Sequence, residues 1–172
     1  MKLEIESLRN HWALLAAMFS SLMLAAAHGF EHFGGMAPCE LCLRQREVYW
    51  VALALGLGLT LAGKFGFTKR GALALLGLVF LTGGLIAGYH AGVEWKFWPG
   101  PASCTGNLEG LSNLGGDLLA GLDQPGEMPK CDQIPWSMLG ISMAGWNALL
   151  SMGLAMISFK LAMPTPKEQV TL

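Results

Sequence analysis

Long stretches without Asp, Glu, Lys, Arg or His divide the chain, and they cover residues 12–27, 48–63, 71–89 and 134–159. None of them has the polar face that a surface helix needs. Crossing the hydrocarbon core takes about 20 apolar residues, and an α-helix satisfies every backbone group inside lipid. The pattern therefore predicts an all-α integral membrane protein with a four-transmembrane-helix bundle. The predicted spans are about 12–28, 43–63, 71–90 and 136–161, in a single membrane domain over residues 1–172.

The composition supports this prediction, because 53% of the residues are hydrophobic and only 13% are charged, against about 25% charged in typical soluble domains. A soluble all-α bundle is the disfavoured alternative. The net charge of −1, with no basic block, does not point to nucleic acid. Lys2 and Arg9 before the first apolar stretch also resemble the start of a signal peptide. We prefer an uncleaved helix, and either reading places the following segment across the membrane.

Lysine and arginine are unevenly distributed over the segments that join the spans. Seven lie at the termini and in the turn between spans two and three: Lys2, Arg9, Lys64, Lys69, Arg70, Lys160 and Lys167. Four lie in the other two loops or at the start of the second span: Arg44, Arg46, Lys96 and Lys130. Because Lys and Arg accumulate in cytoplasmic loops, both termini are predicted to be cytoplasmic. The loops at about 29–42 and 91–135 then face the other side.

All four cysteines fall in these two outer loops, Cys39 and Cys42 in the first and Cys104 and Cys131 in the second. This placement is typical of disulfide chemistry in an oxidising compartment. Cys104 and Cys131 enclose a Pro- and Gly-rich segment that a structural disulfide would stabilise. A Cys39–Cys42 disulfide closes too short a ring to stabilise much, which favours a redox role. Two purely structural disulfides remain an alternative.

The segment after Pro38 is expected to begin a helix at about residues 39–41. Cys42 then lies in the first turn, where free N–H groups and the helix dipole stabilise a thiolate. Arg46 is one turn further on the same face. It is expected to lower the thiol pKa and to donate hydrogen bonds to a polar ligand head group, unless it only anchors the helix at the interface.

Zinc is a competing interpretation, with the Cys-x-x-Cys pair joined by Cys104, Cys131 or a histidine. The second pair lacks Cys-x-x-Cys spacing, so we expect no metal. Two disulfides on the oxidising side instead suggest a relay, because thiol–disulfide exchange moves two electrons between pairs. Neither a dinucleotide-binding motif nor Cys-x-x-Cys-His is present. A quinone at the lipid boundary beside Cys42 and Arg46 fits the position of the pair.

The segment "CELCLRQR", residues 39–46, together with the second cysteine pair and the predicted topology, resembles the DsbB disulfide-bond formation proteins of bacterial inner membranes. The resemblance extends over almost the whole chain. It implies a thiol:quinone oxidoreductase with periplasmic cysteines. Such a protein reoxidises the thioredoxin-fold oxidase DsbA and passes the electrons to ubiquinone or menaquinone.

The resemblance also implies roles for individual residues. Cys104 would form the mixed disulfide with the DsbA-like partner, and Cys131 would then pair transiently with Cys39. Cys42 would be left as the thiolate that reacts with quinone, assisted by Arg46. His90, at the outer end of the third span, matches a family histidine near the quinone.

Glu40 departs from the family pattern, in which apolar residues or proline are common between the cysteines. Its carboxylate is expected to raise the pKa of the Cys39 thiol. Two further functional alternatives stay open. One is a non-enzymatic four-span protein with two structural disulfides, and the other is a DsbB-like paralogue dedicated to a different partner.

Overall fold

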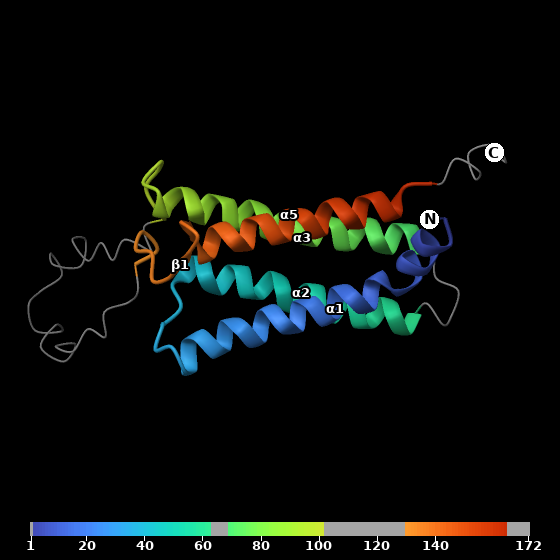
Figure 1. Cartoon of the computed structure of the whole chain (residues 1–172), viewed down its shortest axis with the longest axis horizontal. Helices are drawn as coiled ribbons and strands as arrows, with labels where there is room; N and C mark the ends of the chain where they lie inside the picture. The colour runs from blue at the N-terminus through green and yellow to red at the C-terminus, as the bar shows by residue number, and fades with distance from the viewer. Residues whose placement is uncertain (1, 63–68, 102–129, 165–172) are drawn as a thin grey trace, which may run out of the picture.

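The computed structural model describes residues 2–62, 69–101 and 130–164. These residues form four long helices and one short antiparallel hairpin. The elements are α1 (Lys2–His32), α2 (Glu40–Ala62), α3 (Lys69–Glu94), β1 (Ser137–Met138), β2 (Ile141–Ser142) and α5 (Met143–Ala162). The helices run along the long axis of the molecule (Figure 1). The start of α1 and the end of α5 lie at one end, and the hairpin and the start of α2 lie at the other. A mostly helical fold is therefore confirmed.

Two segments are long and apolar enough to cross a membrane, Glu6–His32 in α1 and Arg70–Glu94 in α3. α2 and α5 are not among these candidate spans. The first turns of α2 are charged, and α5 carries Asn147 and Lys160. The chain is thus a mostly helical protein with two candidate membrane spans in its described residues, and the count of four spans stays a prediction.

The hairpin determines where the last helix begins. Leu139 and Gly140 have φ angles of 54° and 78°, and positive φ at both central residues is typical of tight two-residue hairpin turns. Ser142 then acts as the N-cap of α5, because its hydroxyl accepts a hydrogen bond from the Gly145 N–H at 3.1 Å. The predicted span at about 136–161 therefore starts one residue before the hairpin, and the helix itself begins at Met143.

The helices pack as two pairs. α3 packs most extensively against α5, α1 packs against α2, and α2 joins the pairs through α3, whereas α1 and α5 make few contacts. The α1–α2 contact is close at Gly56, where a Cβ atom would lie 2.7 Å from the Ala13 carbonyl oxygen. The sparse α1–α5 contact leaves space near the hairpin.

The opposite end of the bundle, which holds Trp12 and Ser158, has an apolar core. Its buried cluster includes Trp12, Ala16, Leu73, Leu76, Phe80 and Leu161. The Trp12 indole N–H donates to the Ser158 hydroxyl at 2.8 Å, and Arg9 donates to the Met163 carbonyl at 3.2 Å. Side chains from α1, α3 and α5 thus close this end.

Candidate functional site

The first turn of α2 lies at the cysteine end of the bundle, which also holds Cys39, His90 and the hairpin. Cys39 directly precedes the helix, and its carbonyl accepts the Leu43 N–H at 3.0 Å. Its sulfur accepts the Cys42 N–H at 3.3 Å, so a thiol occupies the position where an oxygen side chain usually caps a helix. Glu40 lies in the first turn, where a carboxylate interacts favourably with the helix dipole. The expected helix start is confirmed. The favourable position of its carboxylate in the first turn is a structural explanation for the presence of Glu40.

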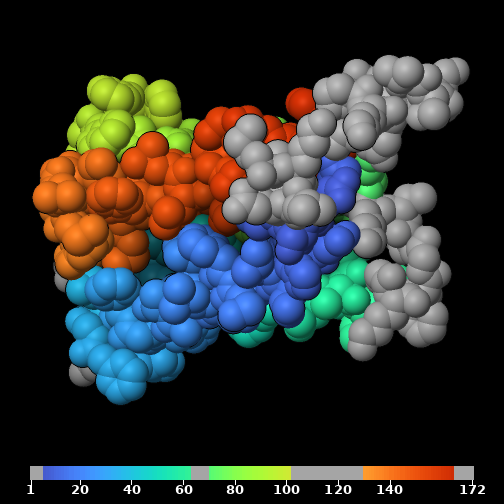
Figure 2. Space-filling view, turned by 45° about the vertical axis from the view of Figure 1, so that its right-hand side comes forward, coloured from blue at the N-terminus to red at the C-terminus, as the bar shows by residue number. Residues whose placement is uncertain are grey.

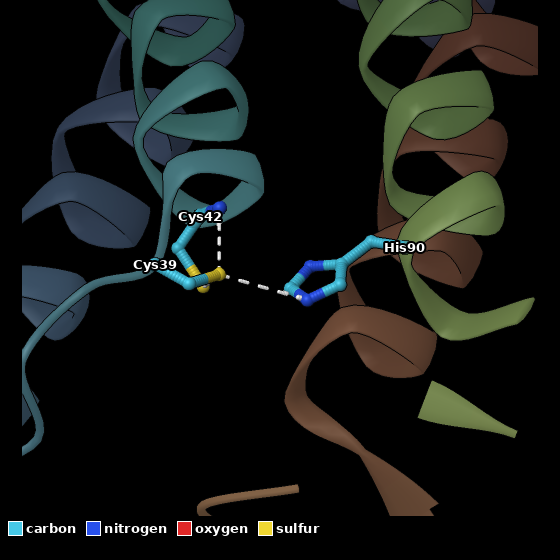
Figure 3. Close-up of side chains that lie close together, drawn as sticks. All are labelled: Cys39, Cys42 and His90. Carbon is cyan, nitrogen blue, oxygen red and sulfur yellow. Dashed lines mark hydrogen bonds between the residues drawn. The ribbon is translucent and has the colours of Figure 1, made fainter. Parts of the chain in front are cut away.

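The two sulfur atoms at the start of α2 lie 2.8 Å apart (Figure 3). Both cysteines are free; Cys39 is buried, and Cys42 is partly exposed. The pKa of Cys42 is lowered, mainly because the Cys39 thiol donates a hydrogen bond to it, and Arg46 adds a smaller effect in the same direction. The pKa of Cys39 is raised by the same hydrogen bond and by burial. The main cause of the raised Cys39 pKa is therefore Cys42, not the expected carboxylate of Glu40, and Cys42 has the lower pKa of the two thiols.

Arg46 connects α2 to the end of α1. Its Nη1 donates to the Glu31 carboxylate, and its Nη2 donates to the Ala27 carbonyl at 3.1 Å. The Arg46 side chain is only 15% exposed, so it is held in place, unlike an anchor extended into water. Each of these nitrogens carries a second N–H. The guanidinium can therefore also donate to a ligand oxygen.

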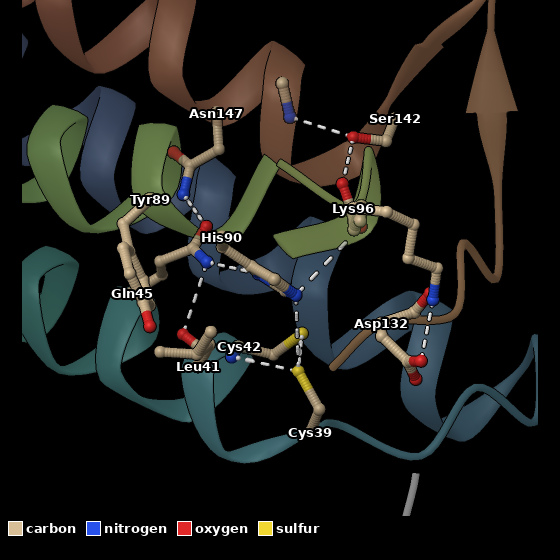
Figure 4. A network of polar contacts seen from close by, with 12 residues as sticks. Cys39, Leu41, Cys42, Gln45, Tyr89, His90, Lys96, Asp132, Ser142 and Asn147 are labelled. Atoms are coloured by element: carbon tan, nitrogen blue, oxygen red, sulfur yellow. Dashed lines mark hydrogen bonds and ion pairs between the residues drawn. The ribbon is translucent and has the colours of Figure 1, made fainter. Parts of the chain in front are cut away.

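His90, in α3, lies against the cysteine pair and is buried. Its Nε2 is 3.7 Å from the Cys39 sulfur and 4.0 Å from a carboxylate oxygen of Glu94. Its Nδ1 is 2.8 Å from the amide nitrogen of Gln45 (Figure 4). The structure thus brings the predicted histidine next to Cys39.

Cys131 is brought to the same place from a distant part of the chain. It is disulfide-bonded, and its residue is 1% exposed. It packs in one buried cluster with Cys39, and Cys42 lies against this cluster. Lys96 fixes the segment to the end of α3 by donating to the Asp132 carboxylate at 2.6 Å and to its carbonyl at 2.8 Å. Cys104 lies outside the described residues, and neither free cysteine is the partner of Cys131.

Sequence reasoning missed three buried polar residues at this end: Gln45, Glu94 and Asn147. Asn147 is the only side-chain amide in the uncharged stretch 134–159, and a polar group within such a stretch is a signal of function. Gln45 and Glu94 could have been found by their helical spacing, since they follow Cys42 by three positions and His90 by four. The Ser142 hydroxyl donates to the Glu94 carboxylate.

A cavity of about 180 Å³ opens beside the cysteines. It lies between α1, α2 and α5, where α1 and α5 approach each other on the face shown in Figure 2. Its walls are mostly apolar and include Cys39, Cys42, Arg46, Pro135 and Trp136. Further lining residues are Leu24, Ala27, Phe30, Met36, Met143 and Leu150.

Comparison with known proteins agrees with this arrangement. The family model described as "Disulfide bond formation protein DsbB" matches residues 9–161. The chain belongs to the DsbB family. A protein of Methylococcus capsulatus named "Disulfide bond formation protein B" is 32% identical over 152 residues, 84% of this chain and 88% of the relative. Proteins of the same name from Azoarcus sp. (28% identity; 86% and 89% covered) and Xylella fastidiosa strain 9a5c (30%; 84% and 84%) are also similar.

No solved structure matches the chain significantly. Membership of the DsbB family supports a membrane protein that acts in disulfide bond formation. The cysteines that the family resemblance singled out at 39, 42 and 131 converge in space.

Proposed function

We propose that this chain is a thiol:quinone oxidoreductase of the bacterial inner membrane. It reoxidises a DsbA-like, thioredoxin-fold partner in the periplasm and passes the electrons through its two cysteine pairs to membrane quinone. In this proposal all four long helices span the membrane, both termini are cytoplasmic, and the cysteine end faces the periplasm.

The observation that carries the proposal is the packing of Cys131 against Cys39. The two cysteines are far apart in sequence and belong to one buried cluster, with Cys42 against it. A purely structural disulfide at Cys131 would not need a free dithiol pair beside it. Thiol–disulfide exchange does need this proximity, because one sulfur must attack another directly.

The exchange between the pairs is balanced in atoms and electrons. When the second pair is reduced by the partner, the Cys131 thiolate attacks the Cys39 sulfur of an oxidised Cys39–Cys42 pair. A Cys131–Cys39 bond forms, the Cys39–Cys42 bond breaks, and its electron pair leaves with Cys42. Cys42 suits this role, because its pKa is lowered relative to an ordinary thiol and a low-pKa thiol leaves more readily.

The cavity beside Cys42 fits an aromatic ring that carries polar oxygens and an apolar tail. Its walls are apolar, and Arg46 supplies donors next to the sulfur atoms. Quinone would accept two electrons and two protons there. Arg46 would orient a quinone oxygen, Cys42 would face the ring, and the Trp136 side chain, which also lines the cavity, would exclude water.

A turnover assay with purified protein tests the proposal. Reduced DsbA-like protein and a soluble ubiquinone analogue are supplied, and quinone absorbance is followed. Wild type is expected to reduce the quinone, and Cys42→Ser is expected to lose at least about 100-fold in rate, because covalent catalysis depends on its nucleophile. Equal rates for wild type and Cys42→Ser would instead support the structural-disulfide alternative.

A dedicated paralogue is the second reading within redox chemistry. The departure at Glu40 is its specific motivation, since the residue between the cysteines differs from the common family pattern. A wild type that turns over with the DsbA-like protein argues against such a specialised partner.

A further inference from the structure

Buried side-chain amides connect α5 and α2 to His90 at the cysteine end. Asn147 donates through Nδ2 to the Gln45 Oε1, and the Gln45 Nε2 lies 2.8 Å from the His90 Nδ1. Both amide residues are buried. Figure 4 shows the three side chains in sequence from α5 to the sulfur of Cys39.

The direction of these hydrogen bonds is fixed by a backbone carbonyl. The Gln45 Nε2 also lies 3.2 Å from the Leu41 carbonyl oxygen, and a carbonyl oxygen only accepts. The amide nitrogen of Gln45 must therefore face Leu41 and His90, and its Oε1 faces Asn147. The opposite arrangement would place two oxygen acceptors against each other. At the far end, the Tyr49 hydroxyl donates to the Asn147 Oδ1 at 2.5 Å, which agrees with this direction.

The Gln45 amide has two N–H groups, and its nitrogen has two partners. One N–H goes to Leu41, and the other points at the His90 Nδ1. A nitrogen that accepts a hydrogen bond carries no proton, so a neutral imidazole must then hold its proton on Nε2. The acceptors near the ring agree with this, because Nε2 faces the Cys39 sulfur at 3.7 Å and Glu94 at 4.0 Å.

We propose that Gln45 and Asn147 are positioning residues that hold His90 in the Nε2–H tautomer and so present a hydrogen-bond donor to the Cys39 sulfur. In the relay, an incoming thiolate bonds to the Cys131 sulfur, the Cys131–Cys39 bond breaks, and its electron pair leaves with Cys39. The Nε2–H then donates to the new Cys39 thiolate. His90 gains no electron and keeps its proton, so its role is electrostatic. The role of His90 in thiol–disulfide exchange rests on the proposed function.

The same geometry argues against His90 as a metal ligand. The ligand atoms of Cys39, Cys42 and His90 lie within 4.8 Å of one another, which is close enough to share a metal ion. Ligation through Nε2 would need a bare Nε2 and a proton on Nδ1. Metal-bound histidines usually donate their other N–H to an acceptor, whereas here the amide N–H of Gln45 occupies that position.

Nitrogen-15 NMR of the full-length chain, reduced and labelled at histidine, tests the tautomer directly. His90 signals are identified by their loss in His90→Gln. The expected result is a one-bond N–H coupling at Nε2 and none at Nδ1. A proton on Nδ1, or on both nitrogens at neutral pH, would overturn the proposal, and His90→Gln serves only to assign the signals.

Gln45→Glu tests whether Gln45 determines the tautomer of His90. It keeps the shape of the side chain but replaces the donor by an acceptor, so the His90 proton is expected to move to Nδ1. Gln133→Glu is the matched control, because it makes the same change at an exposed residue that also lines the cavity. Asn147→Leu removes the bond to Gln45 Oε1 and is expected to produce a mixture of tautomers. An unchanged tautomer in both Gln45→Glu and Asn147→Leu would refute the positioning role.

Turnover measurements on the same variants separate this inference from the proposed function. In Gln45→Glu, kcat is expected to fall roughly tenfold, the size of one charge-assisted hydrogen bond, with little change in the quinone KM. An unchanged kcat together with a shifted tautomer would contradict the role of Nε2–H in exchange. Failure of wild-type turnover would refute the proposed function, while the tautomer result would still stand on its own spectra.

Discussion

The two ends of the bundle are both closely packed, but they are filled with opposite chemistry. At the end that holds Trp12 and Ser158, aliphatic and aromatic side chains such as Leu76 and Phe80 fill the core. At the cysteine end, Gln45, His90 and Asn147 are buried to a similar degree. Buried polar groups reduce stability unless every partner is present. We attribute the polar filling to the proposed function of the cysteine end.

Substitutions at equal depth in the two ends should separate stability from activity. Phe80→Ala is expected to reduce the free energy of unfolding by about 3–5 kcal/mol, the cost of a large buried cavity, with turnover per folded molecule unchanged. Asn147→Leu is expected to cost about 1–3 kcal/mol, because the Gln45 and Tyr49 groups lose a partner, and to lower turnover. Denaturant unfolding and the quinone assay on the same samples measure both quantities. A loss of turnover in Phe80→Ala as large as in Asn147→Leu would remove the distinction between the ends.

The arginines of α2 offer a second comparison, between a held and a solvent-exposed guanidinium. Arg46→Ala is expected to raise the quinone KM roughly tenfold, because a buried charged hydrogen-bond donor contributes about 1.5–3 kcal/mol. Arg44→Ala is the matched control, since Arg44 is exposed and bonds only Glu47 among the described residues. Equal KM values for the two variants would leave Arg46 as a link between α1 and α2.

Arg46→Ala is also expected to have a smaller effect, on the pKa of the Cys42 thiol. Arg46 lowers the pKa of Cys42, and a lowered pKa preserves the thiolate as the pH falls. Alkylation of Cys42 in the reduced protein is therefore expected to shift to higher pH in Arg46→Ala, and only slightly, because the hydrogen bond from Cys39 is the larger cause. Mass spectrometry of the alkylated peptide across pH measures the shift. A shift to lower pH would contradict the assigned sign.

Much of the fold follows from local pattern. The uncharged stretches predicted the helices, and Pro38 with the Cys-x-x-Cys spacing predicted the start of α2. The hairpin before α5 was missed, because its apolar residues continue the pattern of the helix and only the positive φ at Leu139 and Gly140 distinguishes it. The charged residues in the first turns of α2 and Asn147 in α5 lie at the cysteine end.

The candidate site was only partly predictable, for a different reason. Cys39, Cys42 and Arg46 lie within two helical turns, so their proximity follows from spacing alone. The approach of His90 and Cys131 depends on packing between α2, α3 and the segment held by Lys96, which the sequence pattern does not encode locally. Gln45 and Asn147 read as isolated polar residues until the bundle brings them together.

The central claim is that electrons pass between Cys131 and Cys39. It is tested most directly by mixing the oxidised wild-type protein with a reduced DsbA-like partner in the absence of quinone. The mixture is quenched with an alkylating agent, and disulfide-linked peptides are mapped by mass spectrometry. The account predicts a peptide that joins Cys39 to Cys131, together with alkylated Cys42. An intact Cys39–Cys42 peptide under conditions in which Cys131 has been reduced would contradict it.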